Sequence, residues 1–517
     1  MKLSQVFSAA VVGVDALEVE IEVNASGGEA GRTTIVGLPD AAVRESQDRV
    51  WTALANSGFH RPSAAITINL APADLRKEGP SFDLPIAVGI AALTEEIADE
   101  ALEKCLVAGE LALDGRVRPI KGALPMAIEA RRQGRKAILV PEENAAEAAV
   151  VHGIYVYPIR NVRQAIELLL GGSGIKPYQI DREALFHEAR SYDTDFSDVK
   201  GQQSAKRAIE VAAAGNHNLL LVGPPGTGKS MIAQRVPTIM PLMSEDEAIE
   251  TTKIHSIAGT LERGKGLIAT RPYRAPHHTI SDAGLLGGGA NPGPGEVSLA
   301  HHGVLFLDEL PEFRRSTLEV LRQPLEDGHV TISRASGTMT FPAQFMLIAA
   351  MNPCPCGYFG DPKRACNCGT AAVLRYRQRI SGPLLDRIDL HVDVPLINYK
   401  ELSAKTSGET STVIRERVAQ AREIQRQRFA GQTKGGKAVL CNAGMSPRLM
   451  RQHCGIDSES SGLLEHAMNE LNFSARAHDR ILKVARTLAD LEGAEAISAN
   501  HVMEAIQYRT LDRALMG

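Results

Sequence analysis

The stretch Gly223-Pro224-Pro225-Gly226-Thr227-Gly228-Lys229-Ser230 decides the fold of this chain, because it matches the phosphate-loop pattern G-x-x-x-x-G-K-[ST]. It directly follows the apolar run Leu219–Val222, which predicts a buried strand that leads into a glycine-rich turn. Backbone N–H groups in such a turn surround the phosphates of a nucleotide at the N-terminus of the next helix. Lys229 would then reach the β- and γ-phosphates, and Ser230 would ligate Mg²⁺. The sequence therefore predicts a site for ATP and Mg²⁺.

The overall composition is typical of an ordinary globular protein. The chain has 517 residues, enough for about three domains, and a net charge of −4. A net charge this close to zero argues against non-specific binding of nucleic acid by the whole surface, but it does not exclude a local basic groove. No apolar run is long enough to span a bilayer, and Met1–Gln5 has no long apolar core of a signal peptide. The seven cysteines are not spaced as a disulfide framework. We therefore expect a cytoplasmic protein without membrane contact.

Changes of pattern along the chain predict four parts. Strict alternation of apolar and acidic residues in Leu17–Val23 indicates a strand with one buried face. The apolar runs Val304–Leu307 and Phe345–Met351 indicate strands of a parallel sheet that helices cover on both faces. Helical spacing in Ala475–Leu491 gives one apolar face. The predicted parts are an α/β domain at residues 1–172, a polar linker at 173–197, an α/β nucleotide-binding core at 198–397 and a helical domain at 398–517.

Three polar residues stand where the two later strands of the predicted core end. Asp308 and Glu309 follow Val304–Leu307, and Asn352 follows Phe345–Met351. Hydrolysis of a γ-phosphate needs a metal, a positioned water and compensation of charge. Asp308 would hold Mg²⁺, and Glu309 would act as general base on the attacking water. Asn352 could contact the γ-phosphate or orient the water, and the alternative is a turn-forming Asn before Pro353.

In this arrangement the chain resembles the AAA+ ATPases, and more narrowly the magnesium-chelatase-like branch known as the YifB or ComM family. The resemblance covers nearly the whole chain. Its motifs are long, and besides the phosphate loop they are DVKGQ at 198–202, RPYRAPHH at 271–278, VLFLDELPEF at 304–313, AAMNPCPCG at 349–357, SGPLLDRIDL at 381–390 and SARAHDRILKVARTLADLEG at 474–493.

The resemblance implies roles for residues beyond the phosphate loop. Val199 to Gln202 would border the adenine, and Asn352 would be the first sensor of the nucleotide. Arg387 would be an arginine finger offered to a neighbouring subunit, and Arg476 would be a second sensor that reaches back from the helical lid. An arginine finger supplied in trans requires a ring, which the resemblance implies to be a homo-hexamer. From the residues alone, an Arg between two acids indicates a surface ion pair.

Two inserts of the core are candidate segments for contacts with the substrate of such a motor. One is the glycine-rich segment 284–296, which we expect to be flexible, and the other is Val330–Phe341, whose β-branched runs around Ala-Ser-Gly predict a hairpin. The resemblance implies that this hairpin projects into a central pore. Arg334 and Lys265 are either phosphate contacts or solvated surface cations. The basic stretch Arg375–Arg379 could follow a phosphate backbone or line a subunit interface.

Proteins of this family are associated with DNA processing during natural transformation, as helicases that drive branch migration of recombination intermediates. The resemblance thus implies a ring that binds single-stranded or branched DNA. No base-reading motif is visible, so binding should lack sequence preference and depend strongly on salt. Two alternatives stay open. One is the motor subunit of a magnesium chelatase, and the other is an ATP-driven protein remodeller or Lon-like protease.

Four of the cysteines form two C-x-C pairs, Cys354 with Cys356 and Cys366 with Cys368. Four thiolates in a short loop could close a structural Zn²⁺ site. Alternatively the loop buries free cysteines, because C-x-C pairs are less typical of zinc than C-x₂-C. The adjacent His277 and His278 have no third partner in sequence, so we interpret them as pore-loop or packing residues.

Residues 1–172 resemble the proteolytic domain of Lon, through KEGPS at 77–81, GEL at 109–111, RPI at 118–120 and AILVPEEN at 137–144. Lon uses a Ser-Lys dyad, and Ser81 falls at the place of the nucleophile. Leu124 takes the place of the lysine, and Lys121 stands three residues too early. A serine without a base is an ordinary hydroxyl, so we expect this domain not to be proteolytic.

Overall fold

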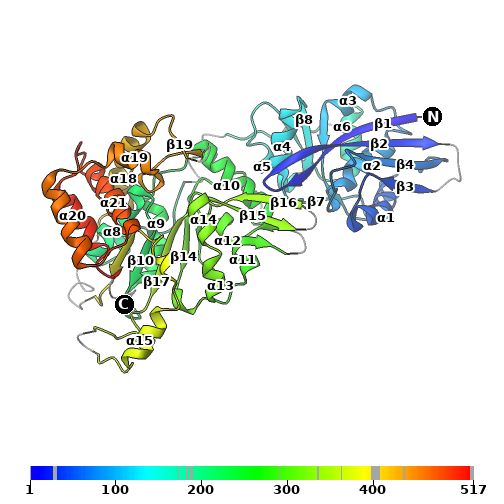
Figure 1. Cartoon of the computed structure of the whole chain (residues 1–517). Coiled ribbons are helices and arrows are strands. Elements are labelled where there is room, and N and C mark those ends of the chain that lie inside the picture. The colour runs from blue at the N-terminus through cyan, green and yellow to red at the C-terminus, as the bar shows by residue number, and fades with distance from the viewer. Residues whose placement is uncertain are drawn as a thin grey trace. The chain divides into compact units, whose positions relative to one another are not determined.

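The computed structural model of the chain describes residues 2–26, 32–172, 174–181, 184–186, 190–262, 264–289, 292–334, 337–361, 364–397, 408–434 and 437–512 (Figure 1). The chain divides into two compact units. Unit 1 contains residues 1–190, 245–269 and 333–341, and unit 2 contains residues 191–244, 270–332 and 342–517. The four parts expected from the sequence stay a prediction, since this division follows packing rather than chain order.

Unit 1 is built on a mixed sheet. Its described strands form a seven-stranded sheet in the order β3 (Thr33–Val36), β4 (Ala65–Ala71), β2 (Asp15–Ser26), β1 (Lys2–Val12), β5 (Cys105–Val107), β8 (Ala137–Pro141) and β9 (Tyr155–Ile159). The helices of this unit are α1 (Ala41–Asn56), α2 (Asp83–Ala91), α3 (Asp99–Glu103), α4 (Ala123–Arg132), α5 (Ala145–Ala148), α6 (Val162–Leu169) and α10 (Glu245–Ala258). The helices α2 and α4 pack on β1 and β2, and α2 belongs to the apolar core of the unit.

The long strand β1 is a finding that the sequence patterns did not predict. It pairs antiparallel with β2 from Lys2 opposite Ala25 to Val12 opposite Asp15. Its inward positions include the buried Ser4 and Ser8, so its buried face is not recognisably apolar. The Ser4 hydroxyl donates to the Gly89 carbonyl oxygen at 2.7 Å, which satisfies one buried polar group.

Unit 2 contains the parallel sheet that the sequence predicted. The described strands are in the order β11 (Tyr273–Arg274), β14 (Val304–Leu307), β17 (Met346–Met351), β10 (Leu219–Val222) and β18 (Leu390–Asp393), and all neighbours are parallel. Helices lie on both faces of this sheet (Figure 1). The helices α8 (Gln203–Gly215), α9 (Lys229–Ile239) and α12 (Glu296–Leu299) contact its strands. Unit 2 also contains α13 (Arg315–Glu319), α14 (Arg322–Asp327), α15 (Thr370–Arg377) and α16 (Gly382–Leu385).

Both inserts of the core are ordered in their described residues. The hairpin expected at Val330–Phe341 is confirmed as β15 (His329–Arg334) and β16 (Gly337–Pro342), while two of its expected turn residues, 335 and 336, lie outside the described residues. The glycine-rich segment, expected to be flexible, contains α11 (Asp282–Leu286) and a ribbon of β12 (Gly287–Gly288) and β13 (Gly293–Pro294).

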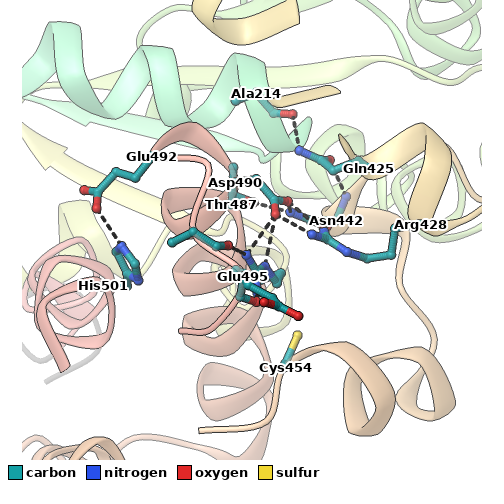
Figure 2. A network of polar contacts seen from close by, with 12 residues as sticks. Ala214, Gln425, Arg428, Asn442, Cys454, Thr487, Asp490, Glu492, Glu495 and His501 are labelled. Atoms are coloured by element: carbon teal, nitrogen blue, oxygen red, sulfur yellow. Dashed lines mark hydrogen bonds and ion pairs between the residues drawn. The ribbon is translucent and has the colours of Figure 1, made fainter. Parts of the chain in front are cut away.

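The C-terminal part of unit 2 is helical, as predicted, with α18 (Ser411–Arg428), α19 (Pro447–His453), α20 (Ser458–Glu470), α21 (Ala475–Leu491) and α22 (Ala499–Gln507). A buried polar network joins these helices to α8 (Figure 2). Gln425 donates to the Ala214 carbonyl oxygen at 3.1 Å, and His217 lies 2.8 Å from the Thr487 hydroxyl. In the described part of the chain, no helix is long and apolar enough to cross a membrane.

Candidate nucleotide site

The phosphate loop leaves the sheet at the end of β10, which lies between β17 and the edge strand β18. At the strand end the Gly223 N–H donates to the Met351 carbonyl oxygen at 3.2 Å. A Cβ on Gly223 would come within 2.2 Å of the Val394 carbonyl oxygen, so only glycine fits there. Gly226 and Gly228 have φ angles of 79° and 85°, the left-handed region that glycine adopts without strain. The helix α9 then begins at Lys229.

Lys229 lies folded into the loop from which it starts. Its ammonium donates to the carbonyl oxygens of Gly223 at 2.7 Å and Pro224 at 2.9 Å, and to Asn352 Oδ1 at 3.3 Å. Burial lowers the pKa of Lys229, and the carboxylates of Asp308 and Glu309 oppose this shift. The structure therefore brings together the predicted lysine, the first-sensor asparagine and both acids of the β14 end.

Ser230 and Asp308 lie side by side, as a shared metal ion requires. The Ser230 hydroxyl donates to Asp308 Oδ2 at 2.6 Å. Asp308 Oδ1 accepts from the backbone N–H of Glu309 at 2.9 Å, which fixes the orientation of the carboxylate. One hydroxyl and one carboxylate oxygen are the protein ligands that Mg²⁺ commonly takes in phosphoryl-transfer sites. These two residues thus fit the metal that the fold family implies.

Glu309 stands at a strained and exposed position beside a histidine. Its φ angle is 52°, a left-handed value that is uncommon for residues other than glycine. Its Oε2 lies 3.5 Å from His278 Nδ1, and the His278 ring meets the ring of Phe313 edge-on at 6.4 Å between centroids. His278, interpreted from the sequence as a pore-loop or packing residue, thus contacts Glu309, a contact that the sequence did not predict. No spacing signal links His278 to Glu309, since the two are brought together by the pairing of β11 with β14.

Asn352 is supported from behind by α15. Burial raises the pKa of the Tyr376 hydroxyl to about 12, and a hydrogen bond from the Asn352 backbone N–H to this hydroxyl limits the rise. The next residue, Pro353, accepts at its carbonyl oxygen from Arg377 Nε at 3.2 Å. Tyr376 is therefore a packing residue, and it is not a stacking platform for bases within the basic stretch Arg375–Arg379.

The two residues expected near the adenine lie at the entrance to α8. Gln202 is buried in a left-handed conformation, with φ of 56°, and its amide donates to the carbonyl oxygens of Thr227 at 3.4 Å and Pro395 at 2.6 Å. Val199 is fully buried in the core of unit 2. Gln202 is thus in direct contact with the phosphate loop, and the adenine contact of both residues stays a prediction.

Arg387 and Arg476 are gathered in a separate cluster. Arg476 pairs with Asp386 at 3.3 Å, and the nearly buried Arg387 pairs with Glu326. Both line a cavity of about 150 Å³ together with Glu326, Asp386, Asp479, Arg480 and Lys483. Within the described residues, neither guanidinium makes a polar contact with the phosphate loop. The structure therefore brings the two predicted arginines together with each other and not with Lys229.

Comparison of the sequence with known proteins gives matches along the whole chain. Residues 195–402 match the family described as magnesium chelatase, subunit ChlI, and residues 408–509 match the C-terminal family of that subunit. Competence protein ComM of Haemophilus influenzae is 44% identical over 518 residues, which cover 100% of this chain and 99% of that protein. The uncharacterized protein YifB of Escherichia coli is 43% identical over 521 residues, with the same coverage. The chain belongs to the ComM/YifB family of magnesium-chelatase-like AAA+ proteins.

The N-terminal region of this ComM/YifB protein has a second relationship. Lon protease 2 of Bacillus subtilis is 25% identical over 182 residues, 32% of each chain, which confirms the partial likeness to Lon. Residues 21–144 also match a family described as subunit ChlI of Mg-chelatase. Among the described residues, the Ser81 hydroxyl has no hydrogen-bond partner, Leu124 is buried, and the Lys121 side chain packs on Gly259. That this domain is not proteolytic stays a prediction.

The four cysteines of the ComM/YifB chain converge to one point. The Sγ atoms of Cys354, Cys356 and Cys366 lie 3.4, 3.7 and 3.6 Å apart, and those of all four cysteines lie within 4.8 Å of one another. A tetrahedral zinc site with Zn–S bonds of about 2.3 Å has sulfurs about 3.8 Å apart. Backbone amides of Tyr358 and Asn367 lower the pKa of Cys356 to about 6. The donor set and its spacing therefore fit Zn²⁺.

The candidate DNA-contacting cations differ in whether they are already ion-paired. Lys265 is exposed and pairs with Glu262 at 2.7 Å, and Arg379 pairs with Glu312 at 2.8 Å. Arg375 is exposed and has no hydrogen bond or ion pair to any described residue. Arg334 ends β15, and its side chain lies outside the described residues. These positions leave the DNA contacts a prediction.

Proposed function

We propose that this protein is an ATP-hydrolysing ring motor that binds DNA and moves along it, as a branch-migration helicase in homologous recombination or natural transformation. The observation that carries the proposal is the grouping of Lys229, Ser230, Asp308 and Asn352 at the phosphate loop, in a chain that matches a competence protein over its full length. We further propose that the protein works in the cytoplasm, where its thiols stay reduced.

The proposed hydrolysis follows from the residues around the phosphate loop. Lys229 neutralises charge on the β- and γ-phosphates once its ammonium leaves the loop carbonyls for the nucleotide. Ser230 and Asp308 would hold Mg²⁺, which lowers the charge on the phosphates when it is bound. Glu309 accepts the proton of the attacking water, and Asn352 orients that water or the γ-phosphate.

The arginine cluster supports assembly into a ring. Arg387 and Arg476 line one cavity with Arg480 and Lys483, so four cations face one space. Glu326, Asp386 and Asp479 line the same cavity, and Arg480 also pairs with Asp389 at 2.8 Å, so an anion that enters would compete with these carboxylates for the cations. We propose that the γ-phosphate of a neighbouring subunit's ATP is that anion, and that six subunits close the ring. In this arrangement Arg476 serves the neighbour rather than its own subunit.

The four-cysteine loop is proposed to hold a structural zinc ion. Cys354, Cys356, Cys366 and Cys368 supply the four thiolates, so no coordination position stays open for a substrate. The role of this ion in the motor is taken up below.

One experiment tests the proposed function against its alternatives. The ATPase rate of the full chain is measured alone, with single-stranded DNA, with branched DNA, with unfolded protein, and with a porphyrin plus chelatase partner subunits. We expect branched and single-stranded DNA to raise the rate at low salt and to lose this effect as salt rises. The proposal fails if no DNA stimulates turnover or binds at low salt.

One observation favours the alternative that this protein is the motor subunit of a magnesium chelatase. Residues 21–144, which lie in the Lon-like N-terminal region, match a family described as subunit ChlI of Mg-chelatase. The N-terminal domain therefore does not separate the two functions. Stimulation by the porphyrin mixture, without stimulation by DNA, would favour the chelatase.

A further inference from the structure

The loop between β17 and α15 connects the four cysteines to the nucleotide site. It runs from Asn352 to Gly369 and has neither helix nor strand in its described residues. Loops of this length that lack secondary structure need another source of order. Cys354 is fully buried, while the other three cysteines are partly exposed, so the loop has little apolar core of its own. Convergence of four thiols on one point is the feature that holds it together.

The first part of this loop contacts the residues of the nucleotide site at two places. At its start, Asn352 lies only two residues before Cys354 and accepts from Lys229. Further along, a Cβ on Gly357 would lie 2.6 Å from Cδ and 2.9 Å from Cγ of Pro225, so the loop backbone packs directly on the phosphate loop. The ring of Phe359 also lies 5.1 Å from the guanidinium of Arg377, the residue that donates to the Pro353 carbonyl oxygen.

We propose that zinc bound by the four cysteines fixes the phosphate loop and Asn352 in place, through the contact of Gly357 with Pro225, so that affinity for ATP depends on zinc occupancy. The inference rests on the zinc site and the ATPase activity proposed above. Binding of a structural metal supplies folding free energy to a loop that lacks a core. None of the four cysteines is among the residues proposed to hold the phosphates or Mg²⁺. The zinc site would therefore act on ATP binding by positioning other residues.

The test uses the full chain and two glycines of the same loop. Gly357 and Gly360 have φ angles of 86° and 80°, so Ala at either position carries similar backbone strain. An added Cβ would collide with Pro225 only at Gly357, because nothing lies within 4 Å of the Cβ position at Gly360. We expect Gly357→Ala to bind one zinc per chain and to weaken ATP affinity about tenfold, as overpacking of this kind does. Gly360→Ala should bind zinc and ATP as the parent does.

Removal of zinc gives the second arm. The parent protein is treated with a zinc chelator in excess Mg²⁺, and zinc content, affinity for a fluorescent ATP analogue and ATPase rate are measured together. We expect zinc loss to weaken nucleotide binding about tenfold or more and zinc return to restore it. In a Pro225→Ala background, Gly357→Ala should lose most of its effect, because the overlapping ring atoms are gone.

Each outcome decides the inference. Absence of zinc from the purified protein overturns the site itself. Equal nucleotide affinity with and without zinc, or of Gly357→Ala and Gly360→Ala, overturns the link to the phosphate loop. A motor that keeps this zinc dependence but ignores every DNA would contradict the proposed function and leave the inference standing.

Discussion

The hydroxyl of Ser230 and the carboxylate of Asp308 are joined by a hydrogen bond of 2.6 Å, although the residues lie 78 positions apart in the chain. This bond connects the first turn of α9 to the end of β14, and it marks where Mg²⁺ would lie. Glu309 follows directly, and its backbone N–H orients the same carboxylate. The proposed metal ligand Asp308 and the proposed general base Glu309 thus follow one strand end, and Ser230 meets them from α9.

The first prediction concerns Glu309. Glu309→Gln removes the proton acceptor but keeps the size of the side chain, so hydrolysis should fall by about 10²–10⁴-fold while ATP binding is retained. Steady-state ATPase assays and nucleotide-binding titrations check this. Glu312→Gln is the matched control, since Glu312 lies in the same turn but pairs with Arg379. Turnover that survives in Glu309→Gln would show that another group is the base.

The second prediction concerns His278, which lies 3.5 Å from the Glu309 carboxylate. We expect His278→Ala to let this exposed carboxylate swing away, which lowers kcat about ten- to a hundredfold and changes KM little. His277→Ala is the control, because its ring packs on His278 and bonds to Thr279 but, among the described residues, makes no hydrogen bond or ion pair with Glu309. Equal effects of the two substitutions would argue for general packing rather than positioning of the base.

Much of the nucleotide site follows from the sequence, because its residues stand next to apolar runs. The strands at Leu219–Val222 and Val304–Leu307 have the predicted bounds, and parallel strands bring their carboxyl ends to one edge of the sheet. Lys229, Asp308 and Asn352 meet there for that reason.

What the sequence could not predict depends on contacts between distant segments. The strand β1 has buried serines in place of an apolar face, so only its pairing with β2 reveals it. The contacts of His278 with Glu309 and of Arg387 with Glu326 join separate segments whose spacing carries no signal. The convergence of four cysteines needed coordinates as well, since two C-x-C pairs fit either zinc or free thiols.

The third prediction tests the ring through mixed subunits. Arg387→Ala alone should lower ATPase activity about 10³-fold or more, the range expected for an arginine finger. Lys229→Ala alone should also be inactive, because its own site loses the phosphate contact. When the two variants are mixed, an Arg387→Ala subunit that follows a Lys229→Ala subunit receives an intact arginine, so activity should partly return.

The control for this mixture is Lys229→Ala mixed with the Lys229→Ala/Arg387→Ala double variant, which should stay inactive at every ratio because no subunit has a working phosphate loop. Recovery in the Arg387→Ala mixture, measured as ATPase rate against mixing ratio, identifies a finger supplied in trans. A mixture as inactive as its components would contradict the proposal and place Arg387 in its own subunit's site. The same design with Arg476→Ala asks whether the second arginine also acts on the neighbour.

The last prediction concerns the buried network of the helical part (Figure 2). The fully buried carboxylate of Asp490 accepts from Arg428 at 2.5 and 2.8 Å, from Asn442 at 2.8 Å and from Arg486 at 3.1 Å. Asp490→Ala would leave these donors, two of them cationic, without their shared acceptor in the interior. We expect the free energy of unfolding of unit 2 to fall by about 3–5 kcal/mol, the cost of breaking a buried ion pair from one side.

Glu492→Ala is the matched control for this change. Glu492 lies two residues further on, is 56% exposed and pairs with His501 at 2.9 Å, so its loss should cost at most about 1 kcal/mol. Thermal and urea unfolding of the full chain, followed by far-ultraviolet circular dichroism, measure both variants. If Asp490→Ala is no less stable than Glu492→Ala, the network does not hold the helices to α8. If it is less stable, ATPase activity should fall at a lower temperature as well, because Gln425 and Thr487 link the same network to the α8 end.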